Sequence, residues 1–149
     1  MTKIWTIGYE HAGLPDFIAE LKRARIATLI DVRELPNSRR AGFSKNTLAA
    51  SLADAGIAYR HLKPLGTPKA GREAAKKGDT ATMHAIVEKK LDTPESQLAL
   101  REAADIAKHG RACLMCLEHD WRVCHRAVVA HRLEAFGFKA EHLAPEMRS

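Results

Sequence analysis

The sequence predicts a three-layer α/β protein with a mainly parallel, open sheet and helices on both of its faces, as in Rossmann-like folds. Short β-rich runs alternate along the chain with segments whose apolar residues have helical spacing. This alternation is typical of parallel strands joined by right-handed helical crossovers. The chain has 149 residues, an ordinary length for one domain, so we expect residues 1–149 to form a single unit.

The first half of the chain contains three predicted strands and two predicted helices. The strands occupy residues 3–8, 27–32 and 57–62. In the first helix the apolar side chains recur at helical spacing, at Leu14, Phe17, Ile18 and Leu21. Pro15 suits the first turn of this helix, where no backbone N–H is needed. Ser44 can cap the second helix, which ends near Gly56.

The second half begins with the least regular segment of the chain, residues 63–79, which is rich in proline, glycine and lysine. We interpret this segment as a loop, either a flexible flap over a site or a plain surface connection. A short helix is predicted next, from the spacing of Met83, Ile86, Val87 and Leu91. The sequence TPE at residues 93–95 then combines a cap, a first-turn proline and an acid, which predicts a helix that runs to Gly110.

Two more strands complete the predicted sheet. Residues 112–117 form a short apolar run that suits a buried strand, and residues 138–143 alternate weakly, as an edge strand does. Because the carboxyl ends of parallel strands share one edge of the sheet, we expect the loop residues after the strands to meet on one side of the molecule. These residues are Tyr9, Arg33, Arg39, Arg40, Glu118 and Cys124.

The composition is typical of a globular protein of the cytoplasm. Hydrophobic residues make up 46% and charged residues 28%, and no apolar run approaches the length of a membrane span. The three cysteines, Cys113, Cys116 and Cys124, lie close together and are odd in number, so we expect reduced thiols instead of a disulfide framework. The formal net charge of +6 favours polyanionic partners, although a solvated basic surface is the commoner explanation.

The stretch after the fourth predicted strand contains the candidate catalytic residues. We expect Cys124 in the first turn of the last long helix, where the helix dipole and a protonated His125 lower the pKa of a thiol. A reactive thiolate is one interpretation of Cys124, and a small buried hydrophobe is the other. Glu118 is a candidate general acid or base; alternatively, it forms an ion pair with Arg33 or Arg126 that holds the loops.

Arginines after two of the strands are candidate ligands for an anion. Asp31 and Arg33 share a strand face, so they can satisfy each other. With Arg39 and Arg126, Arg33 could form a fork for phosphate or carboxylate, and a solvated basic loop is the alternative.

Aromatic and imidazole side chains complete the candidate ligand contacts. Tyr9 and Trp121 could stack on a base or a sugar, although a single aromatic residue is more often a packing residue. His125 lies between the candidate thiol and Arg126, so we include it among the ligand-binding residues.

A zinc site is the alternative use of the same stretch. Its potential ligands are Cys116, His119, Cys124 and His125. Their spacing lacks a C-x2-C pair, and the neighbours Cys124 and His125 would point about 100° apart at the start of a helix. We therefore predict no metal and no cofactor.

Five short motifs are distributed over nearly the whole chain. They are TIGYE at residues 6–10, DVRELPNSRR at 31–40, FS at 43–44, LG at 65–66 and C-x-E-x5-C-H-R from Cys116 to Arg126. Together they resemble the family catalogued as domain of unknown function 488, from which the chain departs at Glu10, where the family has serine, and at Thr67, where it has glycine. The resemblance implies an α/β fold with a shared site and implies no particular reaction.

The hypothesis that we draw is an enzyme that acts on a phosphate-bearing ligand, either a nucleotide or a nucleic acid, in a cleft over the strand ends. Glu118 would transfer a proton and Cys124 would be a nucleophile or an oriented donor, while arginines hold the anion. A noncatalytic module that binds nucleic acid or a protein is the first alternative. A redox protein that uses Cys116 and Cys124 is the second.

Overall fold

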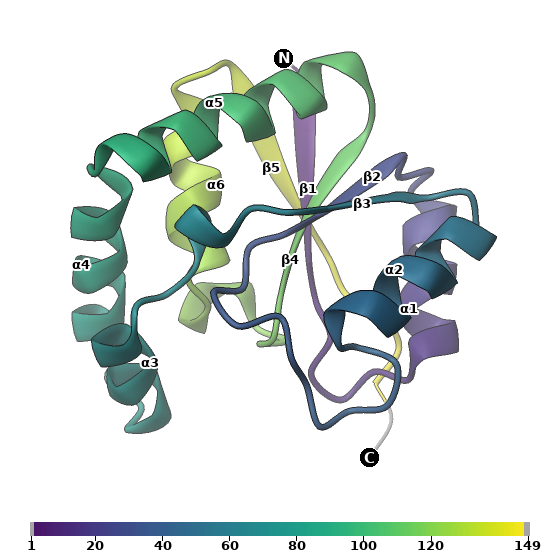
Figure 1. Cartoon of the computed structure of the whole chain (residues 1–149), viewed down its shortest axis with the longest axis horizontal. Helices are drawn as coiled ribbons and strands as arrows, with labels where there is room; N and C mark the ends of the chain where they lie inside the picture. The colour runs from purple at the N-terminus through teal and green to yellow at the C-terminus, as the bar shows by residue number, and fades with distance from the viewer. Residues whose placement is uncertain (1, 148–149) are drawn as a thin grey trace.

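Five parallel strands form the centre of the protein in a computed structural model that describes residues 2–147 (Figure 1). The strands are β1 (Thr2–Gly8), β2 (Thr28–Asp31), β3 (Ala58–His61), β4 (Ala112–Cys116) and β5 (Phe138–Leu143). They pair in the order β3-β2-β4-β1-β5, and each of the four pairings is parallel. The predicted parallel α/β sheet is thereby confirmed, including the edge strand β5.

Helices cover both faces of the sheet, as the sequence predicts. They are α1 (Leu14–Arg23), α2 (Lys45–Asp54), α3 (Lys69–Lys76), α4 (Thr80–Leu91), α5 (Pro94–His109) and α6 (Arg126–Glu134), with two short 3-10 turns, η1 (Lys63–Leu65) and η2 (Trp121–Val123). Figure 1 shows α1 and α2 on one side of the strands and α4, α5 and α6 on the other. No helix within residues 2–147 has both the length and the apolar character that crossing a bilayer requires.

The alternation of side chains along β4 produces two separate hydrophobic cores. Cys113 and Met115 pack in the core beneath α1 and α2, whereas Ala112, Leu114 and Cys116 pack in the core beneath α4, α5 and α6. All five side chains are buried, because a central parallel strand has helices on both of its faces. The two cysteines of the strand, Cys113 and Cys116, therefore lie on opposite faces of the sheet.

The order of the strands creates a crevice at the carboxyl end of β4. The chain leaves β1 and β2 toward α1 and α2, on one face of the sheet, but leaves β4 toward η2 and α6, on the other face. β4 lies between β1 and β2, so the segment that follows β4 and the segments that follow its two neighbours lead to opposite faces of the sheet. Ligands of open α/β sheets bind at such topological switch points.

The prediction of a loop for residues 63–79 is wrong, because η1 and α3 occupy most of this segment. The buried residues of α3 are Gly71 and Ala74, which are too small to mark an apolar helix face in the sequence. A Cβ atom at Gly71 would lie 2.6 Å from Thr67 Cγ2 and 3.4 Å from Ile86 Cγ2. The absence of a side chain at this position thus lets α3 pack closely against α4.

The predicted helix starts are largely confirmed. Pro15 lies in the first turn of α1, and Thr93 is the N-cap of α5. Ser44 is the N-cap residue of α2, but its hydroxyl group makes no capping bond and instead accepts a hydrogen bond from the backbone N–H of Ser38 at 3.0 Å. The side chain of Ser44 therefore fixes the preceding loop.

Gly8, the last residue of β1, permits a close approach of the loop that follows β4. A Cβ atom at this position would lie 1.8 Å from the backbone oxygen of Glu118. We expect Gly8→Ala to lower the free energy of unfolding by about 2 kcal/mol or more, because the loop after β4 has to shift to relieve the overlap. Denaturant unfolding followed by circular dichroism measures the loss.

Gly110→Ala is the matched control for this substitution. The backbone of Gly110 is extended, and a Cβ atom there would meet only the Cβ of Ala27 at 3.6 Å, an ordinary contact. Equal losses of stability in the two variants would contradict the steric explanation.

Candidate functional site

A cleft of about 420 Å³ lies at the carboxyl ends of β1, β2 and β4. Its lining includes Tyr9, Arg33, Cys116 and Glu118 from these strand ends, and His125 from the start of α6. Four of them are the predicted site residues Tyr9, Arg33, Glu118 and His125, so the topology brings these four to one place. The volume falls in the range that is usual for small-molecule sites, about 300–1,000 Å³.

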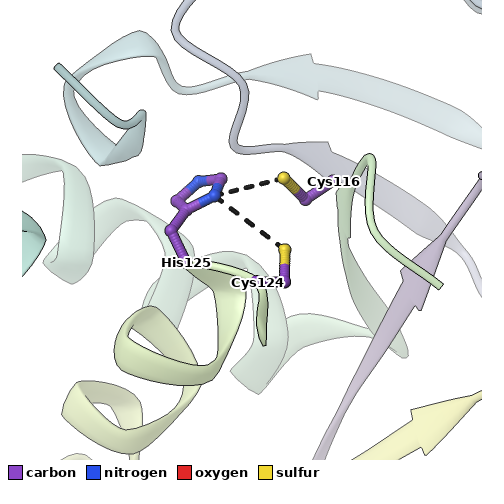
Figure 2. A group of neighbouring side chains, drawn as sticks. All are labelled: Cys116, Cys124 and His125. Carbon is purple, nitrogen blue, oxygen red and sulfur yellow. Dashed lines mark hydrogen bonds between the residues drawn. The ribbon is translucent and has the colours of Figure 1, made fainter. Parts of the chain in front are cut away.

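Three side chains converge on one point beside the cleft, Cys116 from the end of β4 and Cys124 and His125 from the turn between η2 and α6 (Figure 2). His125 Nδ1 lies 3.1 Å from the sulfur of Cys116 and 4.0 Å from that of Cys124. The three potential ligand atoms all lie within 4.8 Å of one another. Each of these side chains is buried, with exposed fractions of 5% or less.

The expectation that Cys124 lies in the first turn of the last helix is wrong. Cys124 has extended backbone angles, φ −106° and ψ 150°, at the end of η2, and α6 begins two residues later, at Arg126. This break turns the thiol of Cys124 toward the same point as His125, so the argument that the two side chains point about 100° apart does not hold. The sulfur of Cys124 also accepts a hydrogen bond from the backbone N–H of Arg126 at 3.5 Å.

Burial and mutual contact shift the pKa values of the converging groups. Burial raises the pKa of the Cys116 thiol well above its ordinary range. Burial also opposes ionisation of Cys124, but hydrogen bonds with Cys116 and His125 outweigh it and lower the pKa of the Cys124 thiol. Burial lowers the pKa of His125, and its contact with Cys124 reverses that shift, so the pKa is raised. Nδ1 of His125 lies nearer to the sulfur of Cys116 than to that of Cys124. We therefore assign a single negative charge to the two sulfurs together, and not to Cys124 alone.

A backbone carbonyl orients the imidazole ring of His125. Its Nε2 lies 2.8 Å from the oxygen of Val32, an acceptor, so Nε2 carries the proton in this contact. The other ring nitrogen, Nδ1, then faces the two sulfurs. In this way the end of β2 positions a residue that belongs to the start of α6.

Glu118 lies in the cleft beside Cys116, and its Oε2 lies 3.6 Å from that sulfur. Burial, followed by the negative charge of Cys124, raises the pKa of Glu118 to about 7. The predicted alternative was an ion pair with Arg33 or Arg126. Among residues 2–147, neither of these arginines pairs with the Glu118 carboxylate, since each donates its hydrogen bonds elsewhere.

Arg126 is fully buried, and its guanidinium group holds the loop that follows β4. Nε donates to Thr6 Oγ1 at 3.1 Å, while the two terminal nitrogens donate to the backbone oxygens of Glu118 and His119, at 2.5 and 3.3 Å. The sequence predicted this guanidinium group as a ligand for an anion in the cleft. Its hydrogen-bond partners instead make Arg126 a positioning residue for Glu118.

Arg33 is buried in an ion pair with Asp31, as their shared strand face allows. Nε and Nη2 donate to the two carboxylate oxygens of Asp31 at 2.9 and 2.8 Å, and Nη1 donates to the backbone oxygen of Phe43 at 2.8 Å. Tyr59 donates a further hydrogen bond to Asp31 at 2.5 Å. Tyr9 stacks on Phe43 with ring centroids 4.6 Å apart, so most of its ring is engaged in packing.

Arg39 and Arg40 lie away from the cleft, contrary to the expectation that they join the other strand-end residues. Both line a separate, more open hollow near the start of α1. Arg40 donates two hydrogen bonds to the backbone oxygen of Ala12, at 3.1 and 2.5 Å. The loop after β2 is long enough to direct these arginines away from Arg33.

Two basic residues of the cleft, Arg72 and Lys76, are not among the predicted site residues; they lie four residues apart on α3. Arg72 forms an ion pair with Glu34 at 3.2 Å and donates to the backbone oxygen of Thr67 at 2.8 Å. Their i, i+4 spacing within residues 69–76 is the signal that could have identified them, once that segment is read as a helix.

Residues 13–133 match the profile of a family described as Domain of unknown function DUF488. The chain belongs to this family. The matched region includes all the residues that line the cleft beyond the first loop, and it ends within α6. No curated protein and no solved structure shows significant similarity to the chain.

Trp121, a candidate from the sequence for stacking on a base or a sugar, stacks on His142 with ring centroids 3.9 Å apart. Burial lowers the pKa of His142 below its ordinary value of 6.5, and the positive charges of Arg126 and Arg122 act in the same direction. The imidazole ring beside the indole is therefore neutral at pH 7.

The fluorescence of Trp121 should report this low pKa. A protonated imidazole quenches a stacked indole, so we expect emission to fall as the pH is lowered, with a midpoint below 6.5. Steady-state fluorescence in a pH titration measures the midpoint, and the variant His142→Gln should lack the transition. A midpoint at or above 6.5, or one that persists in the variant, would contradict the assignment.

Proposed function

We propose that the protein is an enzyme that acts on a small phosphate-bearing molecule of nucleotide size, with Glu118 as the group that transfers a proton. The observation that carries the proposal is the position of the Glu118 carboxyl group, which lies in the cleft at the switch point without an arginine or lysine partner among residues 2–147. A carboxyl group held this way can exchange a proton with a bound ligand.

The backbone around Glu118 supports a positioning role for the loop. Arg126 holds the oxygen of Glu118 itself, and Gly8 lies directly against the same oxygen. The loop is also tied to the segment that follows β1, since the backbone N–H of Glu10 donates to the oxygen of Leu117 at 2.7 Å. These contacts hold the backbone of Glu118 in place and so fix the position of its carboxyl group, as proton transfer requires.

Basic residues on α3 support a phosphate-bearing ligand. Arg72 and Lys76 project from consecutive turns of α3 and line the cleft, so a phosphate group could bind at its rim. Leu35, Met83 and Leu117 supply apolar lining for a ring system. In this arrangement the ring of a nucleotide would face Glu118 and its phosphate would face α3.

Glu118→Gln tests the proton-transfer role. A panel of nucleoside mono-, di- and triphosphates is incubated with the protein, and products are separated by chromatography and identified by mass spectrometry. For a member that is converted, we expect Glu118→Gln to lower kcat by about 10²–10⁴-fold, with a much smaller change in KM, because the amide cannot carry the proton. Glu10→Gln, which changes another carboxyl group of the same cleft, should lower kcat less than about tenfold.

Two results would contradict the proposal. One is turnover by Glu118→Gln at the rate of the unmodified protein. The other is binding of nucleic acid that weakens steeply with salt, is unchanged in Glu118→Gln and is accompanied by no turnover of any nucleotide in the panel. The second result would favour the noncatalytic binding module.

A further inference from the structure

We propose that Cys116, Cys124 and His125 bind one Zn²⁺ ion, with a fourth coordination position that opens on the cleft beside Glu118. The three side chains converge from the end of β4 and from the turn between η2 and α6, as Figure 2 shows. The proposal reverses the prediction of no metal. Zn²⁺ binding can be measured without a substrate, so the metal site can be tested independently of the proposed enzymatic activity.

The distances between the donor atoms fit a tetrahedral zinc ion. Zinc–sulfur bonds of about 2.3 Å and zinc–nitrogen bonds of about 2.0–2.1 Å place tetrahedral donors roughly 3.5–3.8 Å apart. The distances from His125 Nδ1 to the two sulfurs, 3.1 and 4.0 Å, lie on either side of this range. The cluster therefore needs only a small movement to surround an ion.

The surroundings of the three ligands provide independent support. A histidine that binds a metal usually donates its other ring N–H to a carbonyl or a carboxylate, which fixes the ring and its tautomer. His125 does this through Nε2, which donates to the backbone oxygen of Val32 at 2.8 Å. The sulfur of Cys124 accepts the backbone N–H of Arg126, a contact that stabilises a thiolate ligand.

The ligand types select zinc over harder cations. Two thiolates and one imidazole suit Zn²⁺, whereas Ca²⁺ and Mg²⁺ prefer oxygen ligands. Three protein ligands with an open fourth position are typical of catalytic zinc sites, while structural sites have four protein ligands. Here Cys116 and His125 line the cleft and Cys124 does not, so the open position faces the cleft.

Glu118 is suited to act on a water molecule at that fourth position. Its carboxyl oxygen lies 3.6 Å from the sulfur of Cys116, adjacent to the open side of the cluster. Water bound to zinc loses its proton at much lower pH than free water. A carboxyl group beside the open position would accept a hydrogen bond from a water molecule bound there.

Cobalt substitution tests the site in the full-length protein. Metal is removed with a chelator under reducing conditions, and Co²⁺ is then added while the absorption spectrum is recorded. We expect one equivalent of Co²⁺ to give sulfur-to-cobalt charge-transfer bands in the near ultraviolet and intense visible bands of tetrahedral cobalt. Zn²⁺ should displace the Co²⁺ and abolish the spectrum, because zinc binds the same ligands more tightly.

Matched cysteine variants identify the ligands. Cys116→Ser and Cys124→Ser should each weaken Zn²⁺ binding by about 100-fold or more, measured by competition with a chromophoric chelator. Cys113→Ala should bind Zn²⁺ normally, because Cys113 lies on the opposite face of β4. If the variants fail to fold, alkylation of the unmodified protein replaces them: Zn²⁺ should protect Cys116, which lines the cleft, from iodoacetamide.

Four results would overturn the proposal. Three are a weak, octahedral cobalt spectrum, Zn²⁺ affinity that is unchanged in both Cys116→Ser and Cys124→Ser, and alkylation of Cys116 at the same rate with and without Zn²⁺. A reversible disulfide between Cys116 and Cys124 that forms equally fast in the presence of Zn²⁺ would also overturn it, and would favour the redox alternative.

Discussion

The buried guanidinium group of Arg126 is the interaction on which the cleft depends. A buried charge is costly unless hydrogen bonds satisfy it, and here Thr6 and the backbone oxygens of Glu118 and His119 accept from all three nitrogens. These bonds tie the loop after β4 to β1. The backbone N–H of the same residue holds the sulfur of Cys124, so one residue positions both the carboxyl group and the inner thiol.

Further contacts connect the loop after β4 and His125 to the ends of the neighbouring strands β1 and β2. Gly8 leaves room for the loop after β4 to lie directly on the end of β1. The buried pair of Arg33 and Asp31 fixes the loop after β2, and the backbone oxygen of Val32 in that loop orients His125. Three loops from separate strands are thus locked to one another around the two sulfurs. A rigid cluster of this kind can hold a metal ion, and its position at the switch point gives that ion access to a ligand.

Most of the fold could be predicted from the sequence, because strands and amphipathic helices leave strong local patterns. The alternation of β-rich runs and helical spacings was sufficient for the parallel sheet, and the weak pattern of residues 138–143 sufficed for β5. The helix α3 was not predicted, and the reason lies in its own residues. Its buried positions are Gly71 and Ala74, and small residues create a packing surface without creating a hydrophobic pattern.

The candidate site was predictable in its location and not in its details. Parallel topology alone brings Tyr9, Arg33, Glu118 and His125 to one edge of the sheet. The convergence of Cys124 with His125 depends on the η2 turn, which the sequence does not mark, and on extended backbone angles at Cys124. The role of Arg126 could not be predicted either. An arginine after a strand looks the same in the sequence whether it binds a ligand or donates to one hydroxyl oxygen and two backbone oxygens, as it does here.

Anomalous X-ray diffraction at the zinc absorption edge would test the central claim most directly, that this locked cluster is a metal-binding site. Crystals of the full-length protein grown with Zn²⁺ should show one strong anomalous peak between the sulfurs of Cys116 and Cys124 and Nδ1 of His125, with its open side toward Glu118. No peak at this position, or a disulfide joining the two sulfurs in its place, would contradict the account.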